Sequence, residues 1–164
     1  MRDLFIKVAQ SLESGGSFFL GSRNRLFNAF SQNDFTKKER SVGSLGRLQK
    51  ESLLFLTSAA SDLYVSLLNM EDIARFGEIH PHAKNINVTT GHQYTLAELI
   101  KALAEVDLQT KEIHGIHYHP FLGSHNSLAL TNMHKFIPNF IFNSERTNTS
   151  LVPLSSSFIL HVSK

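Results

Sequence analysis

An α/β fold is predicted by the order of apolar patterns along the chain, which alternates helical and strand segments. A helical stripe over residues 2–13 ends at a glycine pair, and a short apolar run at 17–22 follows it. An amphipathic helix at 96–106 then leads into an alternating strand at 111–119. A strand, a helix and a strand in this order favour two parallel strands joined by a crossover. The sequence therefore predicts a sheet with helices packed against it.

The first helix is predicted because its apolar side chains recur on one helical face: Leu4, Phe5, Val8, Ala9 and Leu12. Gly15 and Gly16 follow, at the place where a helix would stop. The next residues, "SFFLG", form a short apolar run that is typical of a buried strand.

Residues 24–94 are interpreted as a helical insertion between the first two strands. Thr36 and Glu39 have the spacing of a capping box at a helix start. A long helix is predicted over 48–68, and residues 71–94, which include Pro81, are predicted to be a loop. The stripe of that long helix is made of apolar residues and is expected to be core: Leu56, Ala60, Leu63 and Leu67.

The second half of the chain begins at another capping box, Thr95 and Glu98. The strand at 111–119 should end at Pro120, since proline cannot donate to a sheet hydrogen bond. Residues 121–154 are predicted to be loop, and a last strand is predicted at 155–163. In that strand Phe158, Leu160 and Val162 point one way, with Ile159 and His161 on the other face.

The composition limits the classes of function. With 164 residues, 41% hydrophobic and 18% charged, the chain fits one packed domain. A formal charge of +2 is too small to indicate a nucleic-acid surface, and the absence of cysteine excludes disulfides and thiolate zinc sites. No stretch resembles a signal peptide or reaches the roughly 18 apolar residues of a membrane span, so a cytoplasmic location is expected.

Three stretches resemble the class I S-adenosylmethionine-dependent methyltransferases. "FIKVAQSLESGGSFFLGSRNRLFNAFS" is similar to the helix, glycine turn and fifth strand of that family. "YTLAELIKALAEVDLQTKEIHGIHYHPF" resembles its last helix and sixth strand, most closely in the ubiquinone-biosynthesis O-methyltransferase group, where the strand ends in His-Tyr-x-Pro. "LSSSFILHVSK" resembles the closing antiparallel strand. The resemblance implies a Rossmann-like sheet of about three strands, with the antiparallel last strand between the other two.

One part of the family pattern is missing. The family holds S-adenosylmethionine with a glycine-rich turn after its first strand and an acidic residue that ends its second, and neither is present here. Gly15 and Gly16 follow a helix instead. Residues 1–164 are therefore expected to be a partial methyltransferase domain, truncated to the C-terminal half, which acts on a small molecule and does not hold the cofactor alone. Such a half should leave an open sheet edge, so a partner chain or self-association is expected.

The candidate site lies where the two parallel strands are expected to end, because ligands of open α/β sheets bind beyond the carboxyl ends of the strands. His117 and His119 should share one face of their strand, with His114 on the other, and a neutral imidazole could accept a proton from a hydroxyl. The other strand is followed by a polar and aromatic cluster with candidate roles in substrate binding: Arg23, Asn24, Arg25, Phe27 and Phe30.

Each assignment has an alternative. The histidines could be a partly exposed strand end, the arginines a solvated helix start, and the phenylalanines ordinary core. Two histidines could also bind a metal with a third ligand from His92, His125 or His134. At the level of the chain, the alternatives to a methyltransferase are a non-catalytic interaction module, one half of a split enzyme, or a histidine-metal hydrolase.

Overall fold

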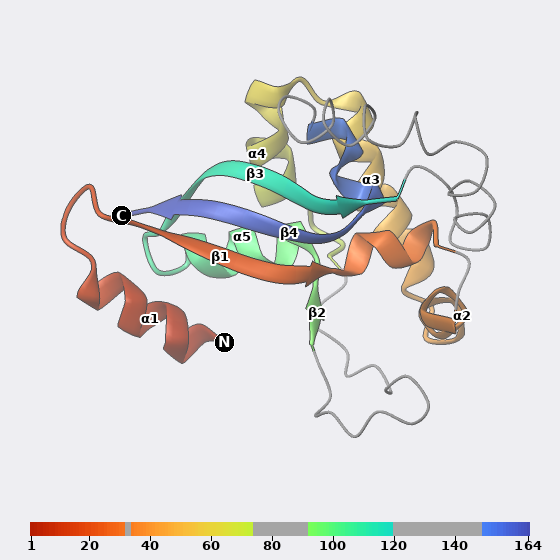
Figure 1. The fold of residues 1–164 in the computed structure, drawn as a ribbon, viewed down its shortest axis with the longest axis horizontal. Coiled ribbons are helices and arrows are strands. Elements are labelled where there is room, and N and C mark those ends of the chain that lie inside the picture. Colours follow the sequence, from red (N-terminus) through yellow and green to blue (C-terminus); the bar gives the residue numbers. More distant parts are fainter. Residues whose placement is uncertain (32–33, 74–91, 120–148) are drawn as a thin grey trace.

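The computed structural model describes residues 1–31, 34–73, 92–119 and 149–164, which form a four-stranded mixed sheet with helices packed against it (Figure 1). The predicted α/β class is confirmed. Helices and strands follow one another in this order: α1 (Arg2–Ser11), β1 (Ser17–Asn24), the 3₁₀ helix η1 (Arg25–Ala29), α2 (Asp34–Ser41), α3 (Leu45–Thr57), α4 (Ala60–Asn69), β2 (Gln93–Tyr94), α5 (Leu96–Ala104), β3 (Gln109–Tyr118), the 3₁₀ helix η3 (Thr149–Leu154) and β4 (Ser155–Ser163).

The sheet has the strand order β2-β1-β4-β3. β4 is antiparallel to both β1 and β3, so these two strands run parallel to one another on either side of it. The prediction that the last strand is antiparallel and lies between the other two is confirmed. The short strand β2 was not predicted; it lies in the segment expected to be loop and pairs parallel with β1 at Arg23 and Asn24.

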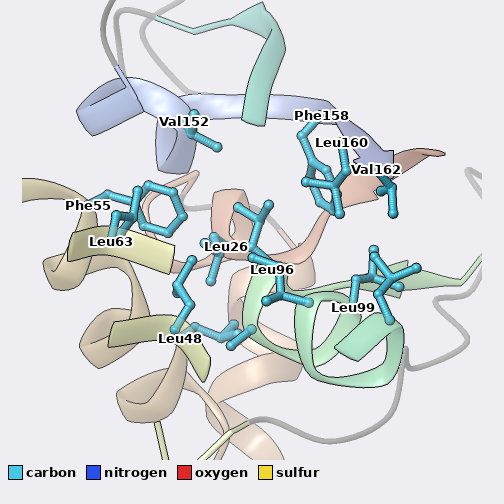
Figure 2. Packing of buried hydrophobic residues seen from close by; sticks show 14 of the residues in the cluster. Leu26, Leu48, Phe55, Leu63, Leu96, Leu99, Val152, Phe158, Leu160 and Val162 are labelled. Atoms are coloured by element: carbon cyan, nitrogen blue, oxygen red, sulfur yellow. The ribbon is translucent and has the colours of Figure 1, made fainter. Parts of the chain in front are cut away.

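The core lies between the sheet and the helices, with residues of α3, α4 and α5 in one buried cluster. Phe158, Leu160 and Val162 alternate along β4 as predicted and are 0% exposed. In Figure 2 they point from the sheet toward α5, whose Leu96 and Leu99 are 0% and 2% exposed. Burying side chains of this size contributes about 1.5–3 kcal/mol each, which fixes α5 against the sheet and sets where β3 begins.

The prediction of one long helix over 48–68 is wrong, because the structure has two helices there. α3 ends at Thr57, and Ser58 and Ala59 have extended ψ angles of 139° and 150° before α4 begins. The apolar stripe is divided accordingly: Leu63 and Leu67 are buried, whereas Leu56 is 62% exposed. The break contains neither glycine nor proline, so no local signal marks it.

The two predicted capping boxes have different outcomes. Thr95 caps α5 as predicted, and its hydroxyl oxygen accepts a hydrogen bond from the Glu98 amide at 3.2 Å. The capping box at Thr36 is wrong, because α2 starts at Asp34 and Thr36 lies inside the helix. Glu39, the other residue of this predicted box, is fully buried. It interacts with residues near the candidate site, described below.

The N-terminal helix α1 is joined to the sheet through the last residue of the chain. Gly15 turns the chain with φ 78°, and its amide donates to the Lys164 carbonyl at 3.3 Å. The Lys164 ammonium group donates to the carbonyls of Ala9 at 2.6 Å and Leu12 at 3.0 Å, at the C-terminal end of α1. A cation there suits the negative end of the helix dipole.

Candidate functional site

The candidate site is the sheet edge at which β1 and β3 end. β1 and β3 run parallel, as expected, so both strands end at the same edge of the sheet. Gln93, Arg23, Ser157 and Ile116 occupy one row across all four strands, one residue before Asn24 on β1 and before His117 on β3. The arrangement brings the arginine cluster and the histidine cluster to one edge of the sheet.

His119 follows the end of β3 and contacts η1. Its ring lies 4.7 Å from that of Phe27 with an interplanar angle of 38°, and its amide donates to the Leu154 carbonyl at 3.0 Å. Burial and, to a smaller extent, the charge of His117 lower the pKa of His119 below its ordinary value. The imidazole is therefore neutral at pH 7 and keeps a nitrogen lone pair that can accept a proton.

His117 is exposed and has a left-handed backbone, with φ 55°. Non-glycine residues adopt this region uncommonly, and histidine is among those that do so more often. Such strain concentrates at functional sites and turns. The backbone also interrupts the alternation of the strand between Gly115 and Tyr118, so an unbroken period of two no longer decides whether His117 and His119 lie on one face.

Gly115 and Tyr118 show the effect of this interruption. A β-carbon on Gly115 would lie 2.4 Å from the Tyr118 hydroxyl oxygen and 2.9 Å from Ser155 Oγ. Tyr118 is 5% exposed, so its ring has little room to move. Residues 115 and 118, three apart, therefore share the buried side of the strand end, and only glycine leaves space for the tyrosine ring.

Replacing Gly115 with alanine is expected to lower the free energy of unfolding by about 1–3 kcal/mol, because an added methyl group in a filled interior forces its neighbours to shift. Gly21→Ala on β1 is the matched control, since its β-carbon would meet nothing closer than 3.9 Å. Urea denaturation of the two variants measures the difference. Equal stability of the Gly115 and Gly21 variants would show that Tyr118 is not packed on Gly115.

Asn24 and Arg25, both predicted to bind substrate, have structural partners in the interior. Asn24 Nδ2 donates to the carbonyls of Val152 at 2.8 Å and Ser155 at 3.0 Å, and Asn24 Oδ1 accepts from the Leu26 amide at 3.0 Å. Asn24 thereby caps η1 and connects it to the start of β4. These bonds use both ends of the amide, so its observed role is to hold the strand ends together.

Arg25 is 1% exposed and forms a bidentate pair with Glu39 of α2. Its Nε and Nη2 atoms donate to Oε1 and Oε2 of that carboxylate, each at 2.9 Å. Arg25 is therefore neither a solvated residue at a helix start nor exposed to a substrate, the two roles considered for it from the sequence. Of the two arginines predicted to bind an acidic group, Arg23 is the one whose side chain is exposed.

Glu39 is the centre of a buried polar network that the sequence reasoning missed. Its carboxylate also accepts from Ser44 Oγ and, at 3.1 Å, from Asn28 Nδ2. Burial alone would raise the pKa of Glu39, but the bonds from Arg25, Ser44 and Asn28 outweigh it and the pKa is lowered. Asn28 Nδ2 also donates to Gln93 Oε1 at 2.8 Å, which ties β2 to η1 beside the site.

The phenylalanines fall on different parts of this region. Phe27 contacts His119, as an aromatic member of the candidate site should. Phe30 is half-buried and packs against the hydrophobic core, as the alternative interpretation expected. In this region the structure places Phe27 against His119 and His117 close enough for its charge to act on His119, while Arg23 is exposed at the same sheet edge.

Further observations concern metals and membranes. Within the described ranges, no three histidine, aspartate or glutamate side chains are grouped so that they could hold a metal ion. His125 and His134, considered as metal ligands, lie outside the described residues. None of the helices in the described part of the chain is long and apolar enough to cross a membrane.

Comparisons of the chain with protein-family models, with curated proteins and with solved structures gave no match.

Proposed function

We propose that the chain is the substrate-side half of a class I S-adenosylmethionine-dependent methyltransferase that acts on a small molecule. The observation that carries this proposal is the sheet order. A last antiparallel strand lies between two parallel strands, and histidine and aromatic side chains lie where the parallel strands end. The sequence resemblance implies the same order for the closing strands of that family.

In this proposal His119 is the general base. Its pKa is lowered by burial, so the ring is neutral and can take the proton of an acceptor hydroxyl. Phe27 offers an aromatic surface beside it, and the exposed Arg23 can pair with an acidic group of the substrate. His117, exposed and adjacent, is the second candidate for contact with the acceptor.

The described residues do not fit the methyl donor. The chain has one glycine pair near β1, and it lies at the amino end of that strand, at the opposite end from the candidate site. Gly15 is engaged there with the Lys164 carbonyl. Because positioning of two reactants can be worth about 7–11 kcal/mol of barrier, the donor has to be held by polypeptide other than these residues.

Calorimetric titration with S-adenosylmethionine tests whether this chain binds the methyl donor by itself. The 164-residue chain is expected to show no binding heat at micromolar concentrations. Micromolar binding by the chain alone would overturn the assignment of the donor site to another polypeptide.

A non-catalytic interaction module is the second candidate, and the outer edge of β1 favours it. In the described part of the chain this edge pairs with β2 only at Arg23 and Asn24. Phe18 and Leu20 are half-buried although the residues opposite them on β4 are fully buried, and Phe19 is 69% exposed. An uncharged apolar edge of this kind invites association with another strand.

We therefore expect the chain to form concentration-dependent oligomers in solution. Phe19→Lys should shift the population toward monomer, because a lysine on an edge strand opposes strand pairing. Val65→Lys is the control, since Val65 is 54% exposed on α4 and away from the edge. Light scattering across a concentration series measures the effect; a wild-type monomer at every concentration would contradict the expectation.

A further inference from the structure

Glu51 is a buried carboxyl group with no role in the chemistry proposed above. It lies on α3, on the side that also carries the buried residues Leu48, Ser52 and Phe55. Its side chain is 1% exposed. Glutamate is rarely buried to this extent unless it is paired, so its partners need to be identified.

The partner of Glu51 is the first turn of α5. Glu51 Oε1 accepts a hydrogen bond from the Ala97 amide at 2.8 Å, across 46 residues of sequence. The first amides of a helix have no partner within the helix, so this bond supplies one. Glu51 Oε2 is buried and has no hydrogen-bond partner. The carboxyl group therefore joins two helices while one of its oxygens is unsatisfied.

The surroundings favour the protonated acid. Burial raises the pKa of Glu51 to about 7, and the nearby charge of Glu98 adds to the rise. The hydrogen bond from Ala97 and the nearby polar groups of Thr95 and Leu96 lower the pKa of Glu51 but are outweighed. A buried, partly unsatisfied carboxylate costs considerably more free energy than the neutral acid does.

Other elements around α3 bring further titratable groups. Glu98 on α5 is the one whose charge acts on Glu51. η1 and α2 also pack against α3 and carry Arg25 and Glu39, which are paired with each other. α4 contributes Asp62 and Tyr64, η3 contains no titratable side chain, and Tyr94 of β2 precedes the cap of α5.

We propose that Glu51 is a proton-controlled latch that holds α3 against the N-terminus of α5 when it is protonated and loosens this contact when it ionises. The geometry supports the latch because a single side chain spans the two helices. Leu48 of α3 and Leu96 of α5 lie in the same core (Figure 2) and would separate if the contact opened. An opened contact admits water, which an ionised carboxylate requires and a neutral acid does not.

The latch is connected to the candidate site by the chain itself. β2 immediately precedes the cap of α5, and its Gln93 accepts the hydrogen bond from Asn28 of η1. Asn28 is adjacent to Phe27, which contacts His119. A shift of the start of α5 therefore acts on the residues that position the aromatic wall of the site.

The sign of the pH dependence follows from the two pKa values of Glu51, about 7 when closed and the ordinary 4.5 when exposed. The closed form binds the proton more tightly, so the latch is strongest below pH 4.5 and weakens as the pH rises to 7. The opening constant rises about five- to sevenfold per pH unit in this window, and by roughly 40-fold between pH 5 and pH 7. Above pH 7 it levels off.

Amide hydrogen exchange at residue 97 tests the proposal, with rates corrected for the intrinsic effect of pH. The protection factor of the Ala97 amide should fall by roughly 40-fold between pH 5 and pH 7 in the wild type. In Glu51→Gln, which keeps an acceptor but cannot ionise, it should be constant. The amide of Leu160 in the middle of β4 is the internal control and should not follow the Ala97 profile.

The proposal is overturned if the Ala97 protection factor does not change with pH, or changes equally in Glu51→Gln. A second measurement needs no variant: the carboxyl carbon of Glu51 in the wild type should titrate by NMR with a midpoint near 7. A midpoint at the ordinary value of 4.5 would equally overturn the latch.

Discussion

The free energy of unfolding should fall by about 3–5 kcal/mol when Glu39 is replaced by glutamine, because the change leaves Arg25 buried without a counter-charge. The guanidinium group is 2% exposed, so it is largely shielded from solvent. The variant also weakens the bonds from Ser44 and Asn28, which link α3 and η1 to the same carboxylate. Urea denaturation monitored by circular dichroism gives the difference.

Glu105→Gln is the control for this prediction. Glu105 lies 3.9 Å from Arg2, and both side chains are more than half exposed, so its loss should change stability by less than about 1 kcal/mol. A double variant, Arg25→Gln with Glu39→Gln, should cost less than the sum of the single changes, since it leaves no unpaired charge. If Glu39→Gln is as stable as Glu105→Gln, the buried pair does not organise this region.

The second large effect concerns catalysis. In an assembly that contains the cofactor-binding polypeptide, His119→Gln should lower the rate of methyl transfer by about 10²–10⁴-fold, the usual contribution of a general base. The pKa of His119 is lowered, so the rate should be constant at neutral pH and fall as the pH drops through that lowered value. Steady-state rates across a pH series measure both features.

His114→Gln is the matched control, because His114 is an exposed histidine of the same strand that is bonded to Glu112 at 3.0 Å. It should leave the rate and its pH profile unchanged. His117 should be tested as His117→Asn, since asparagine tolerates the left-handed backbone at this position. Equal rates in the His119 and His114 variants would contradict the assignment of the base.

The sheet was largely predictable because its signals are local. The alternation of Phe158, Leu160 and Val162 fixes which side of β4 is buried, and Thr95 with Glu98 marks the start of α5. The order of strands came from the family resemblance. β2 was missed because two residues are too few to show a periodicity, and their position depends on pairing with β1.

The site was less predictable because its decisive features are tertiary. Arg25 and Glu39 are 14 residues apart and belong to different helices, so no spacing rule connects them. The spacing of Thr36 and Glu39 indicated a cap, but the energy of the buried pair determines where Glu39 points. Histidine adopts a left-handed backbone too seldom for His117 to be recognised from the sequence, and this backbone interrupts the expected alternation, so that Gly115 and Tyr118 share the buried side.

Transfer of a labelled methyl group tests whether this sheet edge is the substrate side of a methyltransferase. This chain is mixed with the cofactor-binding half of an O-methyltransferase of the ubiquinone-biosynthesis group, labelled S-adenosylmethionine and a phenolic acid. The account predicts labelled small-molecule product only when both polypeptides are present, with much less product when the chain carries His119→Gln. Product formation that is the same with and without this chain would contradict the claim that its sheet edge supplies the substrate side of a methyltransferase.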